Sequence, residues 1–191
     1  MSRITTPLRR ALHRDRADAI LNYWFGSVSA PQKNFQLWFG GTPEIDLDIK
    51  QRFQTDLGRA EAGDYASWLA EPEPAVALII ALDQFSMNIY RDQPKGYQTS
   101  ASAIPLAYTA IGRGFDAKVH ESMRMFFYLP LMHSEHDEDQ RRCLELMHGD
   151  GFAKQHFDVV SQFGLFPGRN EVMGRTSTAE ELEYLKNGGE F

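Results

Sequence analysis

The sequence contains a single cysteine, Cys143, among its 191 residues. An intrachain disulfide is therefore excluded, and this cysteine usage is typical of a reducing cytoplasm. No apolar run approaches the ~20 residues that a membrane-spanning helix needs, and no apolar segment before a cleavage site indicates secretion. We expect a cytoplasmic protein that does not enter the membrane, with Cys143 packed in a helix rather than acting as a nucleophile.

The chain also lacks the basic excess that non-specific nucleic-acid binding requires, because its net charge is -6 and its pI is near 5.5. Positive charge gathers only at the start, where residues 1–14 hold no acid but contain Arg3, Arg9, Arg10 and Arg14. An Arg-rich, acid-poor start is also typical of a transit peptide, but we favour a solvated basic tail. Residues 15–191 are then one domain, since this length is most simply a single core.

Alternating apolar and polar residues, the pattern of strands, are absent over any useful length. Apolar residues recur instead at helical spacing, and the composition of 42% hydrophobic and 12% aromatic residues is typical of a globular protein. The sequence predicts an all-α domain of about eight helices.

Several helix ends are marked by capping residues. Thr42-Pro43-Glu44 predicts a helix start, because Thr caps, Pro fits the first turn and Glu favours the positive end of the helix dipole. Asp15, Ser134 and Asp150 are expected to cap three further helices, and residues 177–180 have the spacing of a capping box.

A helix over about 73–88 is apolar on every side at residues 75–82 and is expected to be buried.

Two prolines bear on other helices. Pro130 should stop a helix that covers about 120–129. Pro105 implies a helix that begins close before it or is kinked.

Polar and aromatic residues are interleaved in three distant segments, residues 82–91, 128–136 and 163–170. Hydrogen-bonding and titrating groups beside large apolar side chains are costly to bury unless each finds a partner. Three such segments predict one shared polar site inside an apolar frame.

The same segments resemble an uncharacterised bacterial family catalogued as domain of unknown function 924, over about residues 17–191. The resemblance is carried by ILNYWFG (20–26), LDQF (82–85) with NIYR (88–91), YLP (128–130) with HSE (133–135), FP (166–167) with RN (169–170), and GR (174–175) with ST (177–178). It implies an all-helical fold similar to an antiparallel tetratricopeptide-like array, and it implies no function. The chain departs from the family pattern at three places: Ser86-Met87 replaces Pro-Arg, Leu165 replaces Arg and Gly168 replaces His. If those basic groups form an anion site, part of it is lost here.

The segment around His133 supports three interpretations. His133 and Glu135 could form an acid/base pair, or with His136 they could bind a metal. Equally, Ser134 could cap a helix whose dipole Glu135 and Asp137 satisfy. The HExxH spacing of zinc hydrolases is absent, so we expect no metal and no cofactor.

The segment around Asp83 supports two interpretations. Gln84 and Asn88 are four residues apart and share a helix face. Asp83, if buried, would need a partner such as Arg91. The group is then either a ligand site or a polar link between this helix and the 163–170 loop.

The third segment offers Arg169 and Asn170 in a loop bounded by Gly and Pro. Arginine suits a carboxylate or phosphate, from a ligand or from the protein itself. Trp38 and Phe39 are expected in the core, with an aromatic wall for a ligand as the alternative.

Three functional hypotheses remain open. The first is a binding module that holds a small anionic molecule or a peptide in an interhelical groove. Its proposed lining residues are Asp83, Gln84, Asn88, Tyr90, Arg91, His133, Glu135, Arg169 and Asn170. The second is a hydrolase-like enzyme in which His133 is the general base and Glu135 orients it. The third is a scaffold whose polar cluster is purely structural. A homodimer is left open, and neither nucleic acid nor membrane is an expected partner.

Overall fold

Residues 6–189 and 191 are described in the computed structural model, with side chains from residue 14 onward. Over these residues every regular element is helical and no strand occurs, which confirms the all-α prediction. The α-helices are α1 (Thr6–Phe25), α2 (Phe35–Phe39), α3 (Pro43–Glu61), α4 (Pro72–Ile80), α5 (Ser86–Ile89), α6 (Pro94–Ala101), α7 (Ile104–Gly112), α8 (Glu121–Arg124), α9 (Leu129–Met132), α10 (Asp137–Leu146), α11 (Gly151–Phe163) and α12 (Ala179–Lys186).

Helix α3 starts where the sequence predicts. The Oγ1 of Thr42 accepts the N–H of Ile45 at 3.4 Å, and Pro43 occupies the first turn. Glu44 lies in that first turn, where its charge favours the helix dipole.

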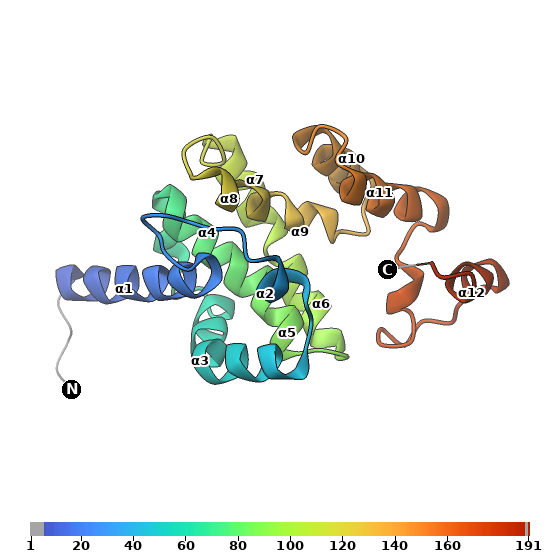
Figure 1. Ribbon diagram of the computed structural model, residues 1–191, viewed down its shortest axis with the longest axis horizontal. Helices are drawn as coiled ribbons and strands as arrows, with labels where there is room; N and C mark the ends of the chain where they lie inside the picture. The colour runs from blue at the N-terminus through green and yellow to red at the C-terminus, as the bar shows by residue number, and fades with distance from the viewer. Residues whose placement is uncertain (1–5, 190) are drawn as a thin grey trace.

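Helix α4 is the centre of the molecule, with α1 beside it (Figure 1), and α3 packs against residues 81–89, which follow α4. Residues 75–82 are all buried, as their continuous apolar character predicts. The rings of Trp24 from α1 and Phe85 meet edge to face, with centroids 5.4 Å apart. This packing gives the polar site a rigid apolar frame.

The chain continues from α4 into α5 through a π-helical turn, Ala81–Phe85. The predicted helix over 73–88 is therefore one nearly continuous run, but the π turn inside it was not predicted. Turns of this kind widen the helix locally and often occur at functional sites. Asp83 lies in the turn and is completely buried.

The C-terminal helices α10, α11 and α12 lie at the end of the molecule opposite α1 (Figure 1). Asp150 caps α11 by accepting the N–H of Phe152, and Gly164 ends that helix in the left-handed conformation. The capping box that opens α12 is formed by Thr178 and Glu181, one position beyond the predicted 177–180 spacing.

Three boundary predictions were wrong. Asp15 does not cap a helix, because α1 begins at Thr6. Residues 6–14 of the predicted basic tail are therefore helical, and residues 1–5 lie outside the described part. Ser134 does not cap α10, which begins at Asp137, because its hydroxyl donates to the carboxylate of Asp139.

Pro130 does not stop a helix but lies in the first turn of α9, where proline is tolerated. The helix predicted over 120–129 is divided into α8 and a 3₁₀ turn, Met125–Phe127.

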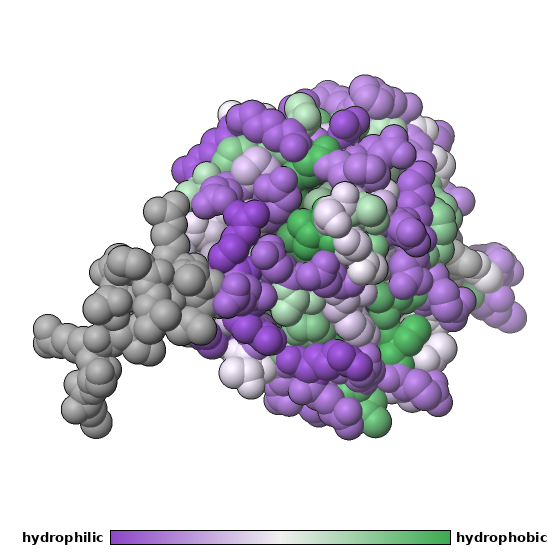
Figure 2. Space-filling view, turned by 60° about the vertical axis from the view of Figure 1, so that its left-hand side comes forward, coloured by the Kyte–Doolittle hydropathy of each residue, from purple (hydrophilic) through white to green (hydrophobic). Residues whose placement is uncertain are grey.

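Within the described residues, no helix is long and apolar enough to cross a bilayer. Figure 2 shows mainly hydrophilic side chains on the face it presents, with apolar side chains scattered between them.

Candidate functional site

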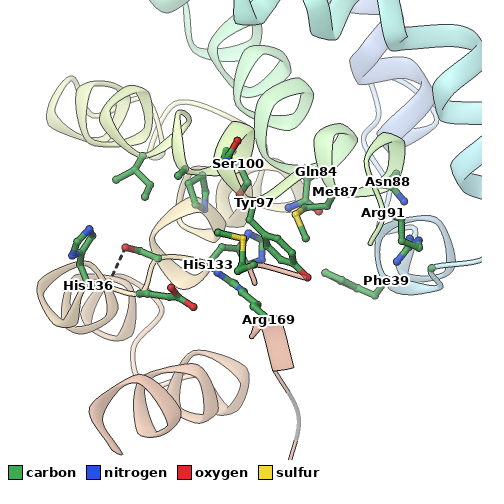
Figure 3. A pocket seen from close by; sticks show the side chains of 18 of the residues that line it. Phe39, Gln84, Met87, Asn88, Arg91, Tyr97, Ser100, His133, His136 and Arg169 are labelled. Carbon is green, nitrogen blue, oxygen red and sulfur yellow. Dashed lines mark hydrogen bonds between the residues drawn. The ribbon is translucent and has the colours of Figure 1, made fainter. Parts of the chain in front are cut away.

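A cavity of about 470 Å³ opens between the central helices and the C-terminal part of the chain. Side chains from α2, α5, α6 and the turn before α10 line it, together with Arg169 and Met173 from beyond α11. The polar groups on its wall include Gln84, Asn88, Arg91, Tyr97, His133, Glu135, His136 and Arg169 (Figure 3). Residues from all three predicted segments therefore meet at one cavity.

Asp83 lies directly behind the cavity wall. Its carboxylate accepts hydrogen bonds from the Nε2 of Gln84 at 2.5 Å, the Oγ of Ser100 at 2.5 Å and the Nδ1 of His133 at 2.9 Å. An ionised carboxylate can only accept, so the proton of His133 is assigned to Nδ1. The Nε2 atom of His133 is then the ring nitrogen left for a ligand.

Burial raises the pKa of Asp83. The charge of His133 and its hydrogen bond, together with the hydrogen bonds from Ser100 and Gln84, lower the pKa by more. The pKa of Asp83 is therefore held below its ordinary value. Asp83 is thus a buried anion that fixes the ring orientation of His133.

His156 from α11 lies behind His133, with ring centroids 6.4 Å apart. Its Nδ1 pairs with the carbonyl oxygen of Phe152 at 2.8 Å, and the ring of Phe191 covers it at 3.8 Å. Burial lowers the pKa of His156 to about 4. His156 is therefore neutral near pH 7, and it is not among the residues that line the cavity.

Arg169 contributes a positive charge to the cavity wall. Its Nη1 donates to the carbonyl oxygen of His133 at 2.9 Å, and its guanidinium lies 4.9 Å from the ring of Tyr97 and 4.2 Å from that of Phe166. No described carboxylate lies within ion-pair distance of it, and burial lowers the pKa of the guanidinium. The Nε and Nη2 donors of Arg169 have no hydrogen-bond acceptor among the described residues.

Glu135 does not orient His133 as expected. Its carboxylate forms a two-bond ion pair with Arg175, at 2.7 and 3.0 Å, and accepts the N–H of Phe166 at 2.9 Å. Burial opposes ionisation of Glu135, but Arg175 and the Phe166 amide outweigh it and hold its pKa below the ordinary value. Asp83 occupies the orienting position, and Glu135 holds the 163–170 loop against the turn before α10.

Arg91 is not the partner of Asp83. Both Arg91 and Asn88 bind the carboxylate of Asp46 from α3, with Asn88 donating at 2.8 Å. Arg91 and Asn88 nevertheless line the cavity, and the charge of Arg91 is compensated there.

Besides Asp83, which lies behind the wall, two predicted ligand residues do not line the cavity. Tyr90 accepts a hydrogen bond from Lys95 at 2.7 Å. Asn170 is buried and donates to Ser177 and Glu181, so it ties the loop to the start of α12.

Sequence reasoning missed Ser100 and Tyr97, because α6 lies outside the three segments. The usable signal was the polar composition of a short helix after Pro94. Of the aromatic pair, Trp38 is buried, whereas Phe39 is 56% exposed and lines the cavity.

The positions that depart from the family pattern have different surroundings. Met87 lines the cavity, whereas Leu165 and Gly168 are not among the lining residues. A side chain at Gly168 would meet the backbone of Phe191 at 2.5 Å. Among the described residues, no group of three or more side chains of the kinds that bind metal is close enough to hold an ion.

Comparison with known proteins agrees with the resemblance noted in the sequence. The model of the family described as "Bacterial protein of unknown function (DUF924)" matches residues 20–189. The chain belongs to this family. No curated protein matches it.

Among solved structures, this DUF924 protein is similar to the protein of unknown function ATU0120 from Agrobacterium tumefaciens. The two are 35% identical, the match covers 94% of this chain and 99% of that one, and the TM-score is 0.81. The two proteins therefore share the all-α fold, while the tetratricopeptide-like arrangement stays a prediction.

Proposed function

We propose that this protein binds a small anionic molecule in the cavity, with Arg169 as the counter-charge. The observation that carries the proposal is the pair of unused donors on Arg169, a partly buried guanidinium without a carboxylate partner among the described residues. Burying such a charge is costly unless it is paired, so a bound anion would supply what the protein leaves out. A guanidinium also presents parallel donors that fit a carboxylate or phosphate.

The neighbouring groups support the same assignment. His133 adds a ring nitrogen beside Arg169, and its orientation is fixed by Asp83. The phenol ring of Tyr97 lies against the guanidinium and restricts its position. A preorganised site of this kind lowers the entropy cost of binding.

Calorimetric titration of the full chain with acetate, phosphate and sulfate tests this proposal. Charge-assisted hydrogen bonds contribute about 1.5–3 kcal/mol, so we expect Arg169→Met to weaken anion binding by about 10- to 100-fold. Arg52→Met is the matched control, because it removes the same charge from an exposed position outside the cavity. Equal affinities for wild type and Arg169→Met would disprove the proposal.

A second candidate function, acid/base catalysis, is favoured by the contact of 2.9 Å between Asp83 and His133 Nδ1. A carboxylate on Nδ1 orients the imidazole and leaves Nε2 to accept a proton. The hydroxyls of Ser100 and Ser134 are engaged with Asp83 and Asp139, so water rather than serine would be the nucleophile in a hydrolysis.

A screen of small anionic esters would test the catalytic candidate. We expect any hydrolysis to fall at least about 100-fold in His133→Gln, the usual scale of a general base. Hydrolysis that persists in this variant would exclude His133 as the base.

A further inference from the structure

We propose that the ligand is an amphipathic monoanion: a carboxylate whose charged end binds Arg169 and whose apolar tail lies against Phe39 and Met87. This inference rests on the proposed function and specifies its ligand class. Three observations support it: the charge balance of the cavity, the apolar character of one wall, and the cavity volume.

The charge balance indicates one negative charge on the ligand. Arg91 is neutralised by Asp46, and Arg175, behind the wall, is neutralised by Glu135. Arg169 is the one lining arginine without a carboxylate partner among the described residues. A single guanidinium without a carboxylate partner matches a carboxylate better than a phosphate monoester, which carries about -1.5 to -2 near pH 7.

Apolar side chains of α2 and α5 form one part of the wall, beside Asn88. Trp38, Phe39 and Met87 lie there, and in the view of Figure 3 Phe39 is on the opposite side of His133 from His136. Phe39 is 56% exposed although it is a large aromatic residue. It stacks on Phe35, which is 57% exposed, with ring centroids 6.2 Å apart.

Because Phe39 lines the cavity and Phe35 does not, this stacked pair extends apolar surface from the wall to the outside of the cavity. Apolar surface of this kind beside a polar site often marks a ligand-binding groove. A tail that leaves the Arg169 end would cover Phe39 and remove its ring from water. Ile104 and Pro130 also line the cavity, but neither is among the exposed large hydrophobic residues.

The volume also favours a ligand larger than a bare anion. A cavity of about 470 Å³ falls in the range that holds drug-sized molecules, roughly 300–1,000 Å³. Acetate would leave most of this space to water, whereas a carboxylate with a tail of several carbons would fill more of it.

The test is a calorimetric titration of the full chain with acetate, butyrate, hexanoate and octanoate, together with hexyl phosphate and 1-hexanol. Burying a methylene group contributes about 0.8 kcal/mol at most, so we expect binding to tighten about two- to fourfold per added methylene. Hexanoate should bind more tightly than both hexyl phosphate and hexanol. Tighter binding of hexyl phosphate would overturn the monoanion assignment.

Variants locate the tail. Phe39→Ala and Met87→Ala should each weaken hexanoate binding about threefold or more and leave acetate binding unchanged. Phe152→Ala is the matched control, since Phe152 is 68% exposed on α11 and does not line the cavity. Circular dichroism checks that Phe39→Ala keeps the overall helix content, and Met87→Ala tests the same wall from a different helix, so a local change in α2 does not affect its result. If the gain in affinity from acetate to hexanoate survives in both variants, the tail does not lie against Phe39 and Met87.

The outcomes separate the two proposals. If acetate and octanoate bind equally and Arg169→Met abolishes both, the anion site stands and the amphipathic ligand is disproved. If hexanol binds as tightly as hexanoate and Arg169→Met changes neither, the anion proposal itself fails, and this inference fails with it.

Discussion

Asp83 and His133 are 50 positions apart in the chain, yet the Oδ1 of Asp83 lies 2.9 Å from the Nδ1 of His133. This contact joins the π turn after α4 to the end of α9. It therefore connects the buried segment that follows α4 to the cavity wall. The pair has both a structural and a chemical role, and substitutions can separate the two.

Asp83→Asn keeps the shape of the side chain but removes its charge. Hydrogen bonds to a charged group contribute about 1.5–3 kcal/mol each, and the Asp83 carboxylate accepts three, so we expect the free energy of unfolding to fall by about 3 kcal/mol at pH 7. Because the pKa of Asp83 is lowered by folding, its stabilising effect is present above the unfolded pKa and is lost as the pH falls through the folded pKa. The difference between wild type and Asp83→Asn should therefore shrink at pH 3, as measured by urea unfolding.

Asp158→Asn is the control for Asp83→Asn, because its carboxylate is exposed in an ion pair with Lys154 on α11. Surface pairs of this kind contribute little. An unfolding free energy of Asp83→Asn close to that of the control would show that the buried pair does not stabilise the fold.

His156 makes the stability depend on pH in a different range. Burial lowers its pKa from an ordinary value of about 6.5 to about 4, so the unfolded chain binds a proton that the folded chain does not. Stability should then decrease as the pH falls from 6.5 toward 4, by about 2 kcal/mol between pH 7 and pH 5. His156→Gln should remove that part of the slope in chemical unfolding curves.

The comparison for His156 is His136→Gln, which removes an exposed histidine at the start of α10. Its curve should follow wild type. Parallel slopes for wild type and His156→Gln between pH 7 and pH 5 would contradict the burial argument.

The sequence predicted the meeting of the three segments but not the pairing inside them. A buried Asp83 requires a partner, and sequence proximity favoured Arg91. That arginine binds Asp46 instead, because α3 packs against α5 and brings an acid closer. Which of several acids reaches a given base depends on how helices pack, and helical periodicity carries no information about it.

The π turn is a second feature that the sequence did not predict. One additional residue per turn at Ala81–Phe85 changes the face on which Asp83 lies, and a regular 3.6-residue count does not predict it. By contrast, Thr42 and the apolar residues 75–82 were placed correctly, since caps and uniform hydrophobicity are local signals. Local chemistry determined the elements, and tertiary packing determined the site.

Cys143 should be unreactive in the folded protein. It is buried in α10, its thiol contacts the carbonyl oxygen of Tyr128, and burial raises its pKa to about 12. The thiolate is the reactive form, so we expect alkylation by iodoacetamide at pH 8 to be at least about 100-fold slower than in the unfolded chain. Mass spectrometry of samples labelled with and without denaturant measures this, and rapid labelling of the folded protein would contradict the burial.

Arg169 and Arg175 offer the sharpest test, because they lie close in sequence but differ in their partners. Arg175→Met removes the counter-charge of the partly buried Glu135, and we expect it to lower the free energy of unfolding by about 2 kcal/mol. Arg169→Met removes a guanidinium without a described carboxylate partner and should leave stability within about 1 kcal/mol of wild type.

Ligand binding should respond in the opposite order. Arg169→Met should weaken anion binding about 10- to 100-fold while the protein stays folded, whereas Arg175→Met should lower the free energy of unfolding and change the anion affinity less. Thermal unfolding and anion titration of the two variants side by side measure both effects. A large loss of stability in Arg169→Met would contradict this assignment. It would indicate that the hydrogen bond from Arg169 to the carbonyl oxygen of His133 is a structural link between the 163–170 loop and the turn before α10.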